Sequence, residues 1–440
     1  MRHSYVARIV NLINEDIQQP RSVTVEHAHT LLRSDNPEDV MKIQGSFALL
    51  VRDGQRVRMA RSLNQPMRYF LAKEAAGPML VVSDRIDSIR SHLETEGYGD
   101  QFHPSYTRMV PAHHVTEIQL VGCPDPNPVH RRFFDPPRES LPADIDLIGK
   151  AYIGVLLDEV SMWLDTIPSD APIGVLFSGG IDSGAVLLAI NHELLVRGDS
   201  PARLKAFTLS VDGEGEDAKQ ARDFLRATEL EMLGETISVA RSRVDPLEAI
   251  QIIEDYKPLD VECAAVVLAL LQGIRDDYPG WRYLVDGDGG DENLKDYPIE
   301  ANPELTIRSV VNNRMLYHEG WGVDAIKHSH TYSGGLSRGC VRGYQPARHY
   351  GFEIFSPFAV PGVISVSEAI PFAKLTRGSH ETLYSLKGDV VASGIRQHLG
   401  VEMPIFPKRR FQDGVFGKLA RDTFSGTEDT YRNHFLSLHA

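Results

Sequence analysis

Two short stretches of the chain combine glycine with serine or aspartate in patterns that suit phosphate chemistry. The first is SGGIDS, residues 178–183, between the buried-strand run GVLF and the apolar helical run GAVLLAI. A strand-to-helix turn presents backbone N–H groups and a helix N-terminus, which bind phosphate oxygens. The two glycines let an anion approach the backbone, and Ser178 and Ser183 add hydroxyl donors. The stretch predicts a phosphate-binding turn, with an ordinary βα turn of Ser and Gly as the alternative.

Asp182 needs its own explanation, because a carboxylate repels a phosphate. A Mg2+ ion between the two would remove the repulsion, so the sequence predicts a magnesium ligand at this position. The Walker loop requires Lys followed by Ser or Thr after its glycines, and the dinucleotide-binding loop requires GxGxxG. The stretch fits neither pattern, which excludes these two classes of nucleotide site here.

The second stretch is DGDGGDE, residues 286–292, directly after the predicted strand WRYLV. Acids packed among glycines at the carboxyl end of a strand suit a Mg2+ ion held jointly with phosphates. No Glu closes the twelve-residue frame of a calcium-binding EF-hand loop. A solvated acidic turn is the alternative.

Another Ser-Gly-Gly, at residues 333–335, lacks this context. The preceding HSHTY is polar rather than a buried strand, and Ser337 stands where the aspartate would be. Arg338 and Gly339 follow where a helix would begin. We expect a loop without phosphate binding.

The elements around the two stretches alternate between strands and helices. Apolar periodicity predicts helices at 144–167, 185–196, 217–228 and 263–274, and strands at 173–177, 204–211 and 281–287. This order is typical of a parallel sheet with right-handed crossovers, in which ligands collect at the carboxyl ends of the strands. Beyond about residue 300 we expect mainly helix.

In the first part of the chain the sequence patterns predict mainly strands. SFALLVRDGQRVRMARS reads as a β-hairpin around Asp53 and Gly54, and MLVVSDRIDSIRSHL as a strand followed by a helix. The polar, proline-rich residues 123–142 read as a linker. We expect a β-rich domain at residues 1–130 and an α/β domain at residues 144–440.

The composition of the chain disfavours several classes of protein function. The net charge of −14 disfavours a general nucleic-acid binder, and three scattered cysteines, Cys123, Cys263 and Cys340, provide no CxxC pair and no disulfide framework. No apolar run is long enough to cross a bilayer, and the N-terminus does not read as a secretory signal. We expect a cytoplasmic protein without membrane contact; the sequence leaves a homodimer open.

Together the two acidic stretches resemble the asparagine synthetase family, in which SGGxDS and a later GxGxDE line one ATP site. FTLSVDG (207–213), GFEIFSPF (351–358), PKRRFQDGV (407–415) and TEDTYRNHF (427–435) resemble later family segments in the same order. GFEIFSPF is similar to the end of a helix before the family's Pro-Phe. The resemblance runs from about residue 40 to 440. It implies an α/β, parallel-sheet ATP pyrophosphatase domain preceded by a smaller, β-rich, truncated amidotransferase-like domain.

The resemblance also implies roles for single residues. Asp182 and Asp291 would ligate Mg2+, and Lys408 would neutralise charge on departing pyrophosphate. Asp288 stands where the family has Glu and the β-lactam synthetases have Tyr, and could orient an amine or accept its proton. The implied ATP-binding residues are Leu176, Phe177, Ser178, Gly179, Gly180, Asp182, Ser183, Leu209 and Gly287.

The chain departs from the family in its amidotransferase half. The family's nucleophilic cysteine follows the initiator Met, whereas residue 2 here is Arg. Ala60, Arg61, Pro66 and Tyr69 resemble a later run of that domain, with Ser62 replacing its Asp. We expect a scaffold without glutaminase activity.

The acceptor side departs as well. Phe355 replaces the Arg before the family's Val-Pro-Phe, and Val391 replaces the Arg that closes a Lys-x-x-x-Arg pattern begun by Lys387. These losses of positive charge indicate an acid other than aspartate. Glu319 is a candidate carboxylate partner for the reacting amine, with an ordinary surface acid as the alternative.

The sequence therefore predicts an AMP-forming carbon–nitrogen ligase that uses ATP and Mg2+ to join a small-molecule carboxylate to an amine. Two alternatives remain open. One is a tRNA-modifying ATP pyrophosphatase, which the acidic charge and lack of CxxC disfavour. The other is a degenerate nucleotide-binding scaffold.

Overall fold

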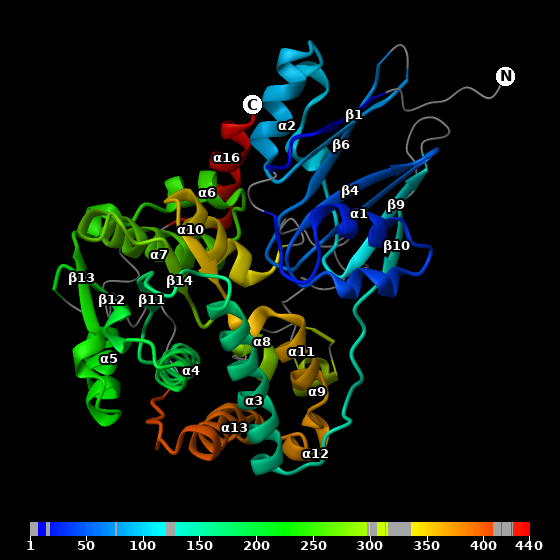
Figure 1. The fold of residues 1–440 in the computed structure, drawn as a ribbon. Coiled ribbons are helices and arrows are strands. Elements are labelled where there is room, and N and C mark those ends of the chain that lie inside the picture. The colour runs from blue at the N-terminus through cyan, green and yellow to red at the C-terminus, as the bar shows by residue number, and fades with distance from the viewer. Residues whose placement is uncertain are drawn as a thin grey trace.

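A computed structural model describes residues 8–14, 18–74, 77–119, 128–213, 215–296, 299, 306–312, 314–315, 336–407, 415, 424 and 426–440. Within these ranges a β-rich domain lies against an α/β domain (Figure 1). None of the helices described combines the length and the apolar character needed to cross a membrane.

The β-rich domain contains two four-stranded sheets that pack face to face. One sheet has the order β1 (Arg8–Asn11), β7 (Met79–Ser83), β6 (Arg68–Ala72) and β8 (Arg108–Met109); the other has the order β10 (Val129–Arg132), β9 (His114–Gln119), β5 (Arg56–Arg61) and β4 (Ala48–Asp53). Val57 and Met59 of one sheet meet Tyr69 and Leu80 of the other in a shared core. Alternating apolar residues of period two supply these inward faces. A short pair, β2 (Gln19–Pro20) and β3 (Gly45–Ser46), lies apart from the two sheets.

Helices cover the outer faces of both sheets. α1 (Val25–Arg33) packs on the β4 sheet through Leu32, and α2 (Ile86–Thr95) packs on the β7 sheet through Ile89. The predicted hairpin is confirmed, since β4 and β5 pair antiparallel with Asp53 opposite Arg56. The predicted linker is wrong over its middle, because β10 pairs with β9.

The α/β domain is built on five parallel strands in the order β13 (Gly234–Val239), β12 (Leu204–Val211), β11 (Ile173–Leu176), β14 (Tyr283–Val285) and β15 (Glu353–Phe355). The three predicted strands form the centre. The two edge strands were not predicted, and β15 replaces the helix end that the GFEIFSPF resemblance implies. The predicted parallel α/β fold is confirmed.

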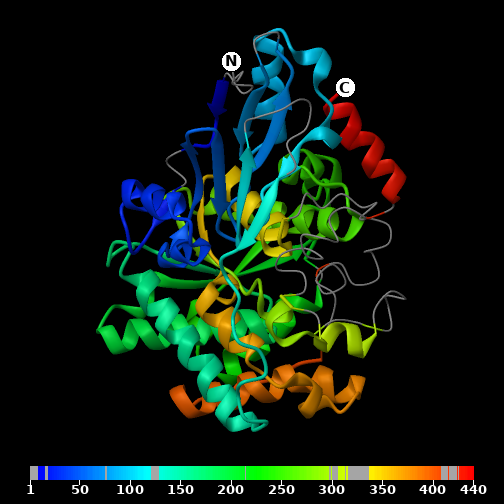
Figure 2. The same ribbon diagram turned by 90° about the vertical axis from the view of Figure 1, so that its right-hand side faces the viewer.

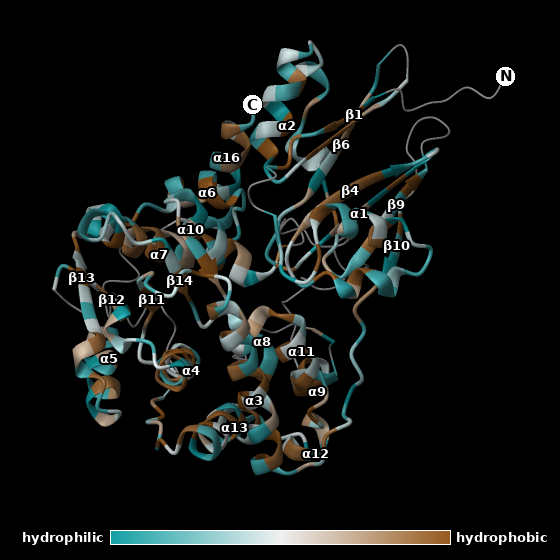
Figure 3. Ribbon diagram, in the orientation of Figure 1, coloured by the Kyte–Doolittle hydropathy of each residue, from teal (hydrophilic) through white to brown (hydrophobic). Residues whose placement is uncertain are grey.

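Helices cover both faces of this sheet (Figure 2). α3 (Ile145–Leu164), α4 (Ile181–Arg197), α5 (Glu216–Ala227) and α13 (His380–Leu399) share one core with β11, and α6 (Pro246–Ile253) and α7 (Pro258–Asp277) share the other with β12 and β13. Apolar residues therefore concentrate on inward faces and polar residues outside (Figure 3). The remaining helices described are α8 (Gly290–Leu294), α9 (Ile307–Asn312), α10 (Gln345–His349), α11 (Pro361–Glu368), α12 (Phe372–Thr376) and α16 (Glu428–Leu438).

A buried carboxylate joins the two domains. Glu254, at the end of α6, lies 3.6 Å from Arg68 and 3.4 Å from Arg85, and accepts a hydrogen bond from the backbone N–H of Ile86 at 2.7 Å. Arg85 also donates to the carbonyl of Ile252. Near the C-terminus, α16 lies beside α2 (Figures 1 and 2), where Arg90 donates to the carbonyl of Leu438.

Candidate functional site

SGGIDS forms the predicted strand-to-helix turn, between the end of β11 at Leu176 and the start of α4 at Ile181. Gly179 has a φ of +72°, and a Cβ there would lie 2.7 Å from the backbone nitrogen of Ala221 on α5, so only glycine fits. The hydroxyls of Ser178 and Ser183 lie 3.2 Å apart. The turn thus places two hydroxyls and a helix N-terminus together.

The acidic stretch forms a second turn, between β14 and α8. Because β14 is hydrogen-bonded to β11, the two turns emerge side by side at the carboxyl ends of neighbouring strands. A Cβ on Gly290 would lie 2.2 Å from Oδ1 of Asp182, and one on Gly287 would lie 2.8 Å from the nitrogen of Ser183. Glycine at these positions lets the turns touch.

The ammonium group of Lys387 lies between the two turns. Its Nζ donates hydrogen bonds to Oδ2 of Asp182 and Oδ1 of Asp291, and lies 3.7 Å from Oδ2 of Asp296. Burial by itself would lower the pKa of Lys387, but the three carboxylates outweigh burial and raise it. The side chain therefore stays protonated, and two distant acids converge on one cation.

A cavity of about 260 Å3 opens beside this cluster. It is lined by most of the predicted site residues: Leu176, Phe177, Ser178, Asp182, Ser183, Leu209, Gly287, Asp288 and Asp291. Gly179 and Gly180 lie within the turn that forms its wall. Lys408 and Glu319 lie outside the described residues, as does Cys123. The structure thus brings the described site predictions together.

Burial and neighbouring carboxylates perturb the acids of the second turn. Burial raises the pKa of Asp286 to about 6, partly opposed by the Ser356 hydroxyl. Burial also raises the pKa of Asp288, and Asp286 and Glu292 add to the effect while Arg342 opposes it. A carboxyl with a raised pKa is better suited to exchange a proton near neutral pH.

The polar residues that line the cavity and were not predicted as site residues include Asp217, Cys263 and Arg342. Arg342 donates to Oδ1 of Asp260 at 2.7 Å, and lies on a helical segment that begins at Arg338. The loop expected at SGGLSRG is therefore wrong at Arg338 and Gly339, which are helical, and Ser333, Gly334 and Gly335 lie outside the described residues.

Lys387 was noted only as the start of a family pattern and not as a site residue. Its position depends on how α13 packs against α3 and α4, which no local pattern encodes. Its single positive charge on an otherwise apolar face, beside Leu386 and Val390, was the available signal.

The acids fit a magnesium ion shared with phosphates. Within the described residues, no group of three or more His, Cys, Asp or Glu side chains forms an all-protein metal site. Mg2+ commonly takes only one or two carboxylates and completes its shell with substrate phosphates and water. Asp182 and Asp291 already share one cation, so they are the two residues that would hold the metal.

Comparisons with known proteins point to the same part of the chain. A family model for asparagine synthase matches residues 164–330, which include both turns. Asparagine synthetase [glutamine-hydrolyzing] 2 of Oryza sativa subsp. japonica is 24% identical over 247 residues, which cover 54% of this chain and 37% of the rice protein. The match thus spans little more than a third of that relative. The segment that carries both turns thus matches the asparagine synthase family model.

Proposed function

We propose that the protein is an ATP-dependent, AMP-forming ligase that joins a carboxylic acid to an amine. The observation that carries the proposal is the meeting of Asp182 and Asp291 on one cation, beside a phosphate-type turn. The match of residues 164–330 to the asparagine synthase family model supports an ATP-dependent ligase. The acid and the amine are small molecules, and the nucleotide occupies the cavity between the two turns.

In the first step, a carboxylate oxygen of the substrate attacks the α-phosphorus of ATP. A bond forms between that oxygen and the phosphorus, the bond to the bridging oxygen breaks, and pyrophosphate leaves. The N–H groups of the first turn, Ser178 and Ser183 hold the phosphates. Lys387, and Lys408 from outside the described residues, offset the negative charge that gathers on pyrophosphate.

Bound Mg2+ would supply further neutralisation of phosphate charge, with Asp182 and Asp291 as its protein ligands. The positive charge of Lys387, beside the same carboxylates, would add to that neutralisation.

In the second step, the amine attacks the acyl carbon, the bond to the AMP oxygen breaks, and the amine loses one proton. Asp288 lines the cavity, and burial raises its pKa. We assign it as the acceptor of that proton, because a base whose pKa lies closer to neutrality takes up protons more readily.

We further propose that the β-rich domain does not hydrolyse glutamine. Its family-like Arg61 is buried and donates to the carbonyls of Val110 at 2.6 Å and Leu63 at 2.8 Å. Ser62, in place of the family's Asp, hydrogen-bonds the backbone of Phe47. These contacts support a scaffolding role.

The acid substrate is proposed to differ from aspartate. Phe355 stacks on Trp163 with ring centroids 5.2 Å apart, and Val391 is buried in the core. Neither position offers the positive charge that a second carboxylate would need.

A screen for AMP release tests the proposal. Purified protein is incubated with ATP and Mg2+ against amino acids and small diacids, with ammonium, with glutamine and with neither. AMP and pyrophosphate should appear in equal amounts with the cognate acid, and Asp182→Asn should abolish both. Asp389→Asn removes an exposed acid from α13 and is the matched control. Release of ADP, or an active Asp182→Asn variant, would contradict the proposal.

A further inference from the structure

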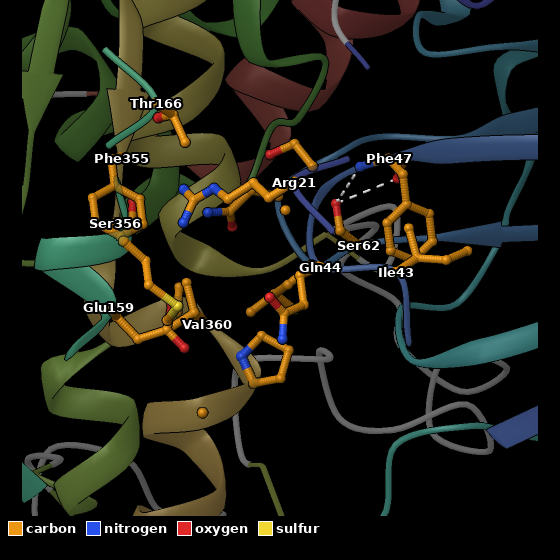
Figure 4. A pocket seen from close by; sticks show the side chains of 18 of the residues that line it. Arg21, Ile43, Gln44, Phe47, Ser62, Glu159, Thr166, Phe355, Ser356 and Val360 are labelled. Carbon is orange, nitrogen blue, oxygen red and sulfur yellow. Dashed lines mark hydrogen bonds between the residues drawn. The ribbon is translucent and has the colours of Figure 1, made fainter. Parts of the chain in front are cut away.

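A second cavity, of about 650 Å3, lies between the β-rich domain and the α/β domain (Figure 4). Its walls come from the β2 and β3 region on one side, and from α3 and residues 354–362 on the other. Cavities of this size hold small organic ligands. Neither the proposed reaction nor the family comparison assigns it an occupant.

Arg21 reaches across this cavity from the β-rich domain (Figure 4). Its guanidinium carbon lies 5.0 Å from the centre of the Phe355 ring, and its backbone N–H donates to the carbonyl of Gln44. Among the described residues, the guanidinium makes no hydrogen bond and no ion pair. The guanidinium carries five N–H donors, and the side chain lines the cavity.

Glu159 projects into the same cavity from α3, on the side where Phe355 lies (Figure 4). No described residue forms a hydrogen bond or ion pair with its carboxylate. Burial raises the pKa of Glu159 and Arg21 opposes the shift; burial lowers the pKa of Arg21 and Glu159 opposes it. The two charges therefore interact electrostatically, although they form no ion pair.

The rest of the lining combines apolar residues with polar ones, such as His113 and Asp165. Ile43, Phe47 and Phe133 line the cavity from the β-rich domain, and Met162 and Val360 line it from the α/β domain. A partly desolvated charge is costly unless it is paired. Arg21 and Glu159 make no ion pair with a described residue, so the cavity matches a ligand that carries both a negative and a positive group.

We propose that this cavity binds a zwitterionic, amino-acid-type ligand. Its carboxylate pairs with Arg21, its ammonium group pairs with Glu159, and an apolar side group rests on the aromatic wall. A bidentate guanidinium–carboxylate pair supplies orientation as well as affinity. The inference goes beyond the proposed ligase activity and does not depend on it.

The cavity adjoins the nucleotide cavity. Ser356 lines the larger cavity and Asp286 lines the smaller one, and the Ser356 hydroxyl lowers the pKa of Asp286. The backbone N–H of Asp286 also donates to the carbonyl of Phe355 at 3.1 Å. A ligand on Arg21 therefore lies one strand away from the second acidic turn.

Calorimetric titration without ATP tests the inference on the full chain. The probes are L-phenylalanine, N-acetyl-L-phenylalanine, L-phenylalanine amide and the dipeptide L-leucyl-L-phenylalanine. The two capped compounds remove the ammonium and the carboxylate charge separately. The variants are Arg21→Gln and Glu159→Gln, with Arg33→Gln and Asp158→Asn as exposed controls.

Phenylalanine or the dipeptide should bind the native protein at least about tenfold more tightly than either capped compound. Glu159→Gln should erase the preference over the N-acetyl compound, and Arg21→Gln the preference over the amide. The controls should keep both preferences. Absence of saturable binding by both zwitterions at millimolar concentration would overturn the inference, as would preferences that survive the two variants.

A double-mutant cycle on thermal unfolding tests whether Arg21 and Glu159 pair directly with each other instead of with a ligand. If Arg21 and Glu159 paired with each other in solution, their substitutions would be coupled. The inference expects at most weak coupling in the absence of ligand, and the strong coupling of a direct ion pair would contradict it.

Discussion

Asp182 and Asp291 stand on separate turns, at the ends of neighbouring strands, and both accept a hydrogen bond from the ammonium of Lys387. Three groups from α4, α8 and α13 thus form one charge cluster. Because none of the three is close to another in sequence, the cluster exists only in the folded α/β domain. Its stability and its chemistry can be tested separately.

Lys387→Met should destabilise the protein, because it leaves three carboxylates facing one another. A fully buried broken pair costs roughly 3–5 kcal/mol, but the side chain of Asp291 is 37% exposed. We therefore expect a loss of about 2 kcal/mol in urea unfolding. Mg2+ should restore more stability to this variant than to the native protein, whereas Asp389→Asn should behave as native. An unchanged unfolding midpoint would refute the cluster.

Gly290→Ala should separate the two turns. The added Cβ would lie 2.2 Å from Oδ1 of Asp182, so the backbone or the carboxylate must move. We expect AMP formation to fall by at least about tenfold, which corresponds to about 1.4 kcal/mol of transition-state stabilisation. Gly280→Ala, where a Cβ meets nothing within 4 Å, is the control. Equal activity of the two variants would show that the close approach is dispensable.

Asp255 should make stability depend on pH. Burial and Asp260 raise its pKa to about 7, whereas an unfolded aspartate titrates at about 3.9. The folded state therefore binds the proton more tightly, so this group favours folding below about pH 4 and that contribution is lost as the pH rises through about 7. Oδ1 accepts the N–H of Tyr256 at 2.7 Å.

Asp255→Asn keeps that acceptor and removes the titration. The melting temperature of the variant should fall less than that of the native protein between about pH 5 and pH 8. If the native protein instead gained stability relative to the variant between these pH values, the pKa of Asp255 would be lowered by folding, which contradicts the raised pKa assigned here.

Glu254→Gln should weaken the joint between the domains. Glutamine keeps one acceptor for the backbone of Ile86 but leaves the buried guanidinium of Arg68 without a countercharge. We expect a loss of about 3 kcal/mol in the free energy of unfolding. Glu248→Gln, on the exposed face of α6, should change it by less than about 0.5 kcal/mol. Similar values for both variants would mean that the buried pair contributes little.

Sequence patterns predicted the central strands well because their apolar runs are long. β12 is apolar over most of LKAFTLSV, whereas the edge strand β13, GETISV, alternates polar and apolar residues, and β15 has only three residues. Short and half-exposed edge strands carry little local signal. The hairpin of β4 and β5 was predictable because a turn signal separates two apolar runs.

The two acidic turns could be predicted because both follow recognisable strands, whose carboxyl ends meet in a parallel sheet. Lys387 could not, since its place between the acids depends on helix packing. The opposed charges of Arg21 and Glu159 depend on how two domains meet, which sequence spacing does not reveal.

The dependence of ATP binding on Mg2+ tests the central claim most directly. ATP is titrated into the native protein, Asp182→Asn, Asp291→Asn and the double variant, with Mg2+ and with chelator. Mg2+ should tighten binding to the native protein and much less so to either single variant. The double variant should lose no more ATP affinity than the more impaired of the two single variants, because both acids would hold the same cation. Full Mg2+ dependence in the single variants, or losses that add in the double variant, would contradict a shared site.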